Sequence, residues 1–337
     1  MAAGFAQGRR RTSALRRAVL AAAALGALPP PAAAACELPI SFPRGARLSG
    51  AALGPQDSLI VVSESGTMLF VDLSDFTVRE DEALNDKYKD SYGWFDLEGV
   101  AMTSPESTFL YLGMENRAAV LEYEWHEAHR ITREFSLPGF EHSEAEGIQS
   151  LTWVPTDAST HQGYFYVGSQ MTGSVFIYEL PLLSNTGPEG NGKLVSIWTP
   201  VRGKKQIRGL SFSSGYVFLS YDDGNSNHVL IFQALGNGLP GDLAEQYEVD
   251  VANAEGMAVR KAGRGTWEVF FSSGAQTAVS VYTFRFVTGF ELHERCAGLM
   301  PALHAGGARP HEVKGLLWPA LACLATLGPA AAALHGG

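Results

Sequence analysis

Leu97-Glu98-Gly99-Val100-Ala101 is one copy of a phrase that the chain repeats five times: a small or apolar residue, a polar residue, glycine and an apolar run. The other copies are Leu48-Ser49-Gly50-Ala51-Ala52, Ala145-Glu146-Gly147-Ile148, Ile207-Arg208-Gly209-Leu210-Ser211 and Ala254-Glu255-Gly256-Met257-Ala258. Successive glycines are 49, 48, 62 and 47 residues apart. A period in this range is typical of radial repeats such as β-propellers.

Two runs rich in Val, Ile, Phe and Tyr follow each phrase, joined by a short polar turn, and such pairs predict antiparallel hairpins. The predicted hairpin strands are 58–63 with 67–73, 108–113 with 118–125, 163–168 with 174–180, 216–221 with 228–233, and 266–272 with 278–286. The phrase supplies a first strand, and looser runs such as 77–82 and 246–251 supply a fourth. We therefore predict an all-β fold, a β-propeller of five four-stranded blades.

A six-bladed ring is the alternative. It would need a sixth phrase and hairpin, whereas residues 36–47 and 287–296 have room only for strands that complete a blade. The long third unit contains a polar insertion at 183–193, and residues 81–94 form a second polar connection.

The N-terminal segment, residues 1–35, has the features of a secretory signal peptide. Five arginines between Arg9 and Arg17 precede the apolar run Ala18–Leu28, and small residues lead up to Cys36. The apolar run is too short and too interrupted by proline to span a bilayer. We expect the protein to be secreted or held on the extracellular side of the cell surface.

The C-terminal segment, residues 301–337, combines a small-residue spacer with an apolar tail. Ala305–Ala308 are small, 309–315 are polar and 316–334 are almost entirely apolar, which matches a GPI-anchor signal. A single membrane segment is the alternative, although Pro319 and Pro329 would disturb a helix. A low-complexity tail without function is the third interpretation.

Residues 36–300 remain as the propeller domain, and this part contains only two cysteines, Cys36 and Cys296. Two cysteines that bracket a secreted domain favour a disulfide, and in a ring the two chain ends meet at one blade. The alternative is a lipidated or processed Cys36 with an inert Cys296.

The net charge of −10, without a basic stripe outside the leader, argues against nucleic acid as a partner. We expect a monomer that binds a small polar ligand or a protein surface and meets a membrane only through its C-terminal tail. Motifs for nucleophilic catalysis or for phosphate binding are absent from the sequence.

The residue before each repeat glycine should lie near one end of the central channel, because the first strand of each propeller blade lies nearest the axis. These residues are Ser49, Glu98, Glu146, Arg208 and Glu255. Carboxylates that face a common axis repel one another and need neutralisation. Oxygen ligands suit Ca²⁺, so the sequence predicts a calcium site at Glu98, Glu146 and Glu255. An ion-pair ring around Arg208 and purely structural hydrogen bonding are the alternatives.

A second recurrent position follows the second strand of each blade and carries Glu64, Glu115, Gln170, Asp222 and Gly274. Strand ends at a channel mouth face a ligand. The predicted ligand-contacting residues at the mouth are therefore Glu64, Glu115, Gln170, Arg208 and Asp222. Hairpin turns are polar by default, which accounts for part of this pattern.

On these motifs the chain resembles the SdiA-regulated family, relatives of NHL-repeat propellers. The resemblance spans residues 45–290 and rests on 96–101, 144–148, 219–223 and 253–258. It implies a five-bladed propeller that binds calcium, without a defined activity, and carries the calcium role to Glu98, Glu146 and Glu255. Ser49 and Arg208 depart from an all-acidic set.

Two functions follow from these residues and motifs. The first is a binding or scaffold module that holds calcium or a small polar ligand in its central channel. The second is a calcium-dependent hydrolase of the lactonase, esterase or phytase kind, which uses the same carboxylates and rests on analogy of fold.

Overall fold

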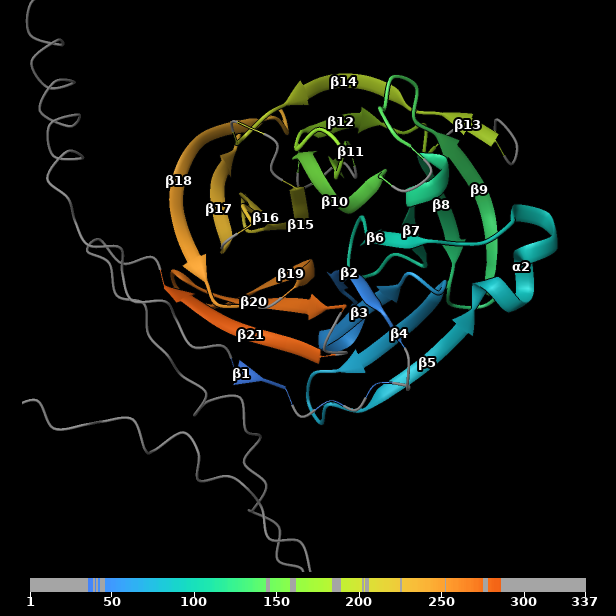
Figure 1. Cartoon of the computed structure of the whole chain (residues 1–337), viewed down its shortest axis with the longest axis horizontal. Helices are drawn as coiled ribbons and strands as arrows, with labels where there is room; N and C mark the ends of the chain where they lie inside the picture. Colours follow the sequence, from blue (N-terminus) through green and yellow to red (C-terminus); the bar gives the residue numbers. More distant parts are fainter. Residues whose placement is uncertain are drawn as a thin grey trace, which may run out of the picture. The chain divides into compact units, whose positions relative to one another are not determined.

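The computed structural model describes residues 36–38, 40, 42, 46–143, 146–157, 162–183, 189–201, 203, 206–224, 226–251, 253–274 and 278–285. This part of the chain forms five small sheets, built of antiparallel strands and arranged in a ring (Figure 1). The five-bladed β-propeller is therefore confirmed. The predicted leader, the C-terminal segment and Cys296 lie outside the described residues. No helix in the described ranges is long and apolar enough to cross a membrane.

Each blade is a meander whose first strand lies innermost (Figure 1). Blade 1 contains β2 (Leu48–Leu53), β3 (Ser58–Ser63), β4 (Thr67–Asp72) and β5 (Val78–Ala83). Blade 2 contains β6 (Leu97–Ala101), β7 (Phe109–Met114), β8 (Ala119–Glu124) and β9 (Arg130–Ser136). Blade 3 contains β10 (Ile148–Asp157), β11 (Gln162–Ser169), β12 (Val175–Glu179) and β14 (Lys193–Trp198). Blade 4 contains β15 (Gln206–Ser213), β16 (Tyr216–Asp222), β17 (Asn227–Ala234) and β18 (Pro240–Val249).

Blade 5 closes the ring with strands from both ends of the domain. Its inner strands are β19 (Ala254–Gly263), β20 (Thr266–Ser273) and β21 (Ala278–Arg285), and its outer strand is β1 (Cys36–Glu37). Cys36 is paired with Val281 in the β1–β21 ladder. The prediction that the N-terminal residues complete a blade is confirmed, and the disulfide stays a prediction because Cys296 is not described.

Two connections differ from the polar loops expected from the sequence. The first contains a helix, α2 (Leu84–Tyr92), between blades 1 and 2. The second, the insertion of blade 3, contains β13 (Glu189–Asn191), which pairs in parallel with β9. Blade 2 thus becomes a five-stranded sheet, whereas four strands were predicted for every blade.

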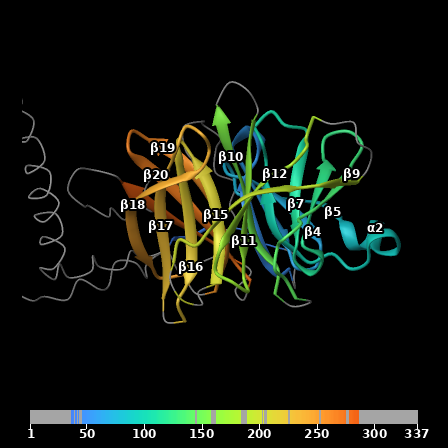
Figure 2. The ribbon, with the colours of Figure 1, turned by 90° about the horizontal axis from the view of Figure 1, so that it is seen from above.

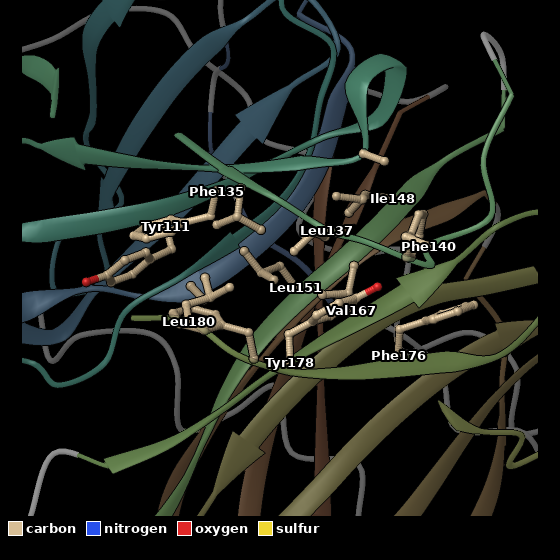
Figure 3. Close-up of a cluster of buried hydrophobic side chains, with 14 of the residues drawn as sticks. Tyr111, Phe135, Leu137, Phe140, Ile148, Leu151, Val167, Phe176, Tyr178 and Leu180 are labelled. Atoms are coloured by element: carbon tan, nitrogen blue, oxygen red, sulfur yellow. The ribbon is translucent and has the colours of Figure 1, made fainter. Parts of the chain in front are cut away.

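The hydrophobic core lies between blades, because each sheet buries both faces against its neighbours. Figure 3 shows one such layer, in which Tyr111 of blade 2 and Leu151, Val167 and Phe176 of blade 3 belong to the same buried cluster. Seen from the side, the strands stand along the axis of the ring (Figure 2). Runs of apolar side chains on the inner strands therefore cover both faces of a blade, and polar side chains lie mostly at the strand ends.

The inner strands approach one another closely because each carries a β-bulge at the repeated phrase. A methyl group on Gly256 would lie 2.2 Å from the carbonyl oxygen of Ser49 in the next blade. A methyl group on Gly99 would lie 2.9 Å from the backbone nitrogen of Leu151. At Gly99 and Gly256 a side chain would overlap these backbone atoms, which explains why glycine recurs in the phrase.

We expect Gly256→Ala to lower the free energy of unfolding by about 3 kcal/mol, because its methyl group would overlap backbone atoms that cannot rotate away. Gly263→Ala is the matched control in the same strand, since no heavy atom lies within 4 Å of its added methyl group. Urea unfolding measures both variants. Equal stability of the two would contradict the role of close backbone packing at Gly256.

Candidate functional site

The bulge of each inner strand presents one polar side chain toward the axis. The shift of register lies near the start of the inner strand in all five blades. The polar residues at these bulges are Ser49, Glu98, Gln149, Arg208 and Glu255. Four of these five positions agree with the sequence prediction. The fifth is a correction, because blade 3 places Gln149 where Glu146 was expected.

Glu146 is exposed and precedes β10, outside the ring of axial side chains. The bulge of blade 3 lies between Ile148 and Ser150, so Gln149 is the bulged residue. Ser150 takes the place of the repeat glycine, which hid the true phrase Ile148-Gln149-Ser150 in the sequence. Gly147 instead packs against the backbone of Glu115.

The axial side chains form two separate groups, and a direct ion pair neutralises the charge in one of them. Arg208 forms an ion pair with Glu255, with Nη1 2.7 Å from Oε2. Burial raises the pKa of Glu255, and Arg208 opposes this rise. The expected ring around Arg208 is therefore reduced, among the described residues, to a pair between blades 4 and 5.

Among the described residues, Glu98 forms no ion pair, and neutral hydrogen-bond donors hold its carboxylate. Gln149 donates from Nε2 to Oε2 of Glu98 at 2.6 Å, and Ser49 donates from Oγ to Oε1 at 3.4 Å. The residue is only 5% exposed. Burial raises its pKa well above the usual range, and the nearby carboxylates of Glu115 and Asp96 add to the rise.

Three carboxylates of blade 2 converge, and that of Glu98 is one of them. Asp96, Glu98 and Glu115 each offer an oxygen atom, and these atoms all lie within 4.8 Å of one another. Asp96 immediately precedes β6, two residues before Glu98, so both side chains leave the strand on the same side. Glu115 begins the short helix η2 (Glu115–Arg117) after β7, and its N–H donates to the carbonyl oxygen of Asp96 at 3.0 Å. We call these three residues the acidic triad.

The sequence predicted roles for Glu98 and Glu115 but not for Asp96. The signal was present, because Asp96 and Glu98 flank a buried strand residue at the two-residue period of a strand. Gly147, just before β10 of blade 3, packs directly against the backbone of Glu115. A methyl group on Gly147 would lie 2.1 Å from the carbonyl oxygen of Glu115, so a side chain here would displace this member of the acidic triad.

Two buried oxygen atoms, one of the acidic triad and one of the neighbouring Gln149, have no hydrogen-bond partner among the described residues. Oδ1 of Asp96 and Oε1 of Gln149 are buried without a hydrogen bond. Gln149 itself is only 2% exposed. Burial, with the charge of Asp96 as the next cause, raises the pKa of Glu115 to about 8. Burial also raises the pKa of Asp96. This arrangement of oxygen acceptors, in which Arg47 offsets only part of the charge of Asp96, is chemically suited to a hard cation.

The other predicted mouth residues remain outside the acidic triad. Glu64 forms an ion pair with Arg47 at 2.6 Å. Asp222 accepts a hydrogen bond from the N–H of Gly224 at 2.6 Å and so stabilises a hairpin turn. Gln170 follows β11 and has a buried Oε1 without a described partner. Of the predicted mouth residues, Glu115 alone belongs to the acidic triad.

Comparisons with known proteins leave the family open. No protein-family model matches the chain. A search of curated proteins also finds no match. The resemblance to the SdiA-regulated family is therefore confirmed only for its fold, the five-bladed propeller.

Two solved structures are similar in part. Glutaminyl cyclase from Myxococcus xanthus has 14% sequence identity and a TM-score of 0.49, over 75% of this chain and 97% of that chain. The Cps50 (Swd1) β-propeller domain of Myceliophteria thermophila has 10% identity and a TM-score of 0.39, over 74% of this chain and 100% of that chain. Neither likeness is strong enough to support a functional inference.

The acidic triad predicts a pH-dependent stability in the presence of chelator. Its pKa values are raised in the folded state, so its protonated form stabilises the fold below about pH 4.5, and that stability is lost as the pH rises toward 8. We expect the free energy of unfolding to fall by about 2 kcal/mol between pH 5 and pH 8 from this cause.

Urea unfolding in EDTA across this range measures the effect. Comparison with Glu98→Gln/Glu115→Gln isolates it, because the neutral amides do not titrate. A double variant with the same pH slope as the parent protein would contradict the assignment.

Proposed function

We propose that the chain is a calcium-binding β-propeller that acts as a binding or scaffold module, with the ion held by Asp96, Glu98 and Glu115. The observation that carries the proposal is the convergence of three carboxylate oxygens within 4.8 Å in a largely buried position. Gln149 contributes an amide oxygen beside them, and Ser49 completes the polar surroundings of Glu98. The three carboxylates belong to blade 2, and the hydrogen bonds of Glu98 to Ser49 and Gln149 link the ion site to blades 1 and 3.

The donor set favours calcium among the common metals. The acidic triad offers only oxygen atoms, whereas structural zinc sites use cysteine and histidine. Calcium accepts six to eight oxygen ligands in flexible geometry, while magnesium demands near-ideal octahedral geometry. Three ionised carboxylates and a dication carry a net charge of −1, so the ion allows all three side chains to ionise with little repulsion.

The binding module is favoured over the hydrolase. Glu98 and Glu115 are buried, and Glu98 accepts hydrogen bonds from two neighbouring blades, so neither side chain is placed for proton exchange with a bulky ester or phosphate. The guanidinium of Arg208 is occupied by Glu255. The hydrogen bonds of Glu98 and the ion pair of Arg208 are typical of a structural ion site rather than of a site that binds and releases substrate.

The proposed setting is extracellular, which agrees with the leader and the anchor signal expected from the sequence. Extracellular calcium modules work at dissociation constants of about 0.1 to 1 mM, and a solvent-shielded triad suits that range or tighter. The same proposal includes a monomeric protein that binds a small polar ligand or a protein partner.

Isothermal titration calorimetry of the purified protein tests the calcium site. We expect binding that is lost in Asp96→Asn and in Glu115→Gln, because each removes one charged ligand. At a calcium concentration about a hundred times the dissociation constant, the ion should add about 2.7 kcal/mol to the free energy of unfolding.

Glu146→Gln and Glu255→Gln are the matched controls. Glu146 is exposed, and Glu255 is paired with Arg208, so both variants should retain calcium binding. Loss of binding in these two variants, with retention in Asp96→Asn, would reject the acidic triad and restore the ligand set expected from the sequence.

A further inference from the structure

A polar and aromatic groove lies between blades 1 and 2, at the end of the blades opposite to the acidic triad. Its lining includes Ser58, the first residue of β3, and Thr108, which directly precedes β7, whereas Glu115 follows the last residue of β7. The groove has a volume of about 680 Å³. Ligand pockets commonly enclose about 300 to 1,000 Å³, so the groove is large enough for a small organic molecule.

The walls of the groove are held in place by contacts from outside it. Gln56 adopts a left-handed backbone conformation, with φ of 54°, and the neighbouring Asp57 forms an ion pair with Arg260 of blade 5. His129 on the other wall also has a positive φ, 48°. Its carbonyl oxygen accepts hydrogen bonds from Lys87 and Tyr88 of α2. Unfavourable backbone conformations persist where surrounding contacts enforce them, and they occur often at ligand-binding sites.

The floor of the groove is an aromatic platform. Phe70 of blade 1 and Trp125 of blade 2 both line it, with ring centroids 5.6 Å apart. The indole N–H of Trp125 donates to the carbonyl oxygen of Ser107 at 3.1 Å, which fixes the orientation of the ring. The two rings, from different blades, therefore offer a rigid apolar surface.

The rim of the groove carries hydrogen-bonding groups of mixed charge: Gln56, Asp72, Arg79, Glu106 and His126. The side chains of Gln56 and Glu106 are both exposed. Carboxylate, guanidinium and amide groups together donate and accept hydrogen bonds without a dominant charge. A neutral ligand with many hydroxyl groups and one apolar face matches this combination.

We propose that this groove binds a pyranose sugar or a short oligosaccharide, whose C–H face packs on Trp125 and Phe70 and whose hydroxyl groups bind the rim. Weak C–H contacts to an aromatic ring and several neutral hydrogen bonds give modest affinity. A monosaccharide of about twelve heavy atoms at ordinary ligand efficiency has a dissociation constant of about 1 mM. The site is independent of the calcium proposal, because its residues are separate from the acidic triad.

Saturation-transfer difference NMR on the full chain tests the proposal with a panel of methyl pyranosides and cellobiose at about 10 mM. We expect transfer to at least one sugar, strongest at the C–H protons of one face. Gln56→Ala/Glu106→Ala should weaken binding at least about tenfold, because it removes two rim groups while both positions are exposed. Trp125→Leu should abolish the transfer, with thermal melting used to confirm that this variant is folded.

The matched control is Gln162→Ala/Glu179→Ala, an equivalent pair that lines a separate groove of blade 3. It should bind the sugar as the parent protein does, with and without EDTA. The proposal is overturned if no sugar receives transfer, if the Gln56/Glu106 variant binds the sugar as tightly as the parent protein does, or if transfer disappears in EDTA while the protein stays folded.

Discussion

The close approach of five inner strands around the axis is the constraint on which the structure depends. The bulge at each repeated phrase brings the strands together backbone to backbone, and Gly256 against Ser49 shows how little space remains. The same bulge forces one polar side chain per blade toward the axis. The feature that closes the ring therefore also creates a crowded polar channel end, whose charges must be balanced.

The charge balance separates the channel end into two halves. Arg208 neutralises Glu255 by a direct ion pair at 2.7 Å. Glu98 receives hydrogen bonds only from the neutral Gln149 and Ser49 among the described residues, and Arg47 offsets only part of the charge of Asp96. Burial makes this costly, since a buried carboxylate either binds a proton or needs a cation. Calcium at the acidic triad resolves the imbalance, and protonation is the alternative response of the metal-free protein.

The sequence was sufficient for the fold and insufficient for the register of one blade. The period of the glycine phrases and the hairpin runs predicted five blades, because close strand packing and apolar alternation are local constraints. The identity of the third axial residue was not accessible in this way. Gly147 satisfies a different contact, against Glu115, and Ser150 replaces the expected glycine. The spacing of Asp96 and Glu98 could be seen in the sequence, but the position of Glu115 beside them follows from the fold, which places the start of β6 next to the end of β7.

A crystal structure of the protein grown in calcium chloride tests the calcium site most directly. We predict an anomalous peak between Asp96, Glu98 and Glu115, with carboxylate oxygens at about 2.3 to 2.6 Å and an oxygen of Gln149 among the nearest neighbours. An ordered acidic triad without a peak, or a peak coordinated by Glu255 with Arg208 displaced, would contradict the assignment of the ion to these three residues.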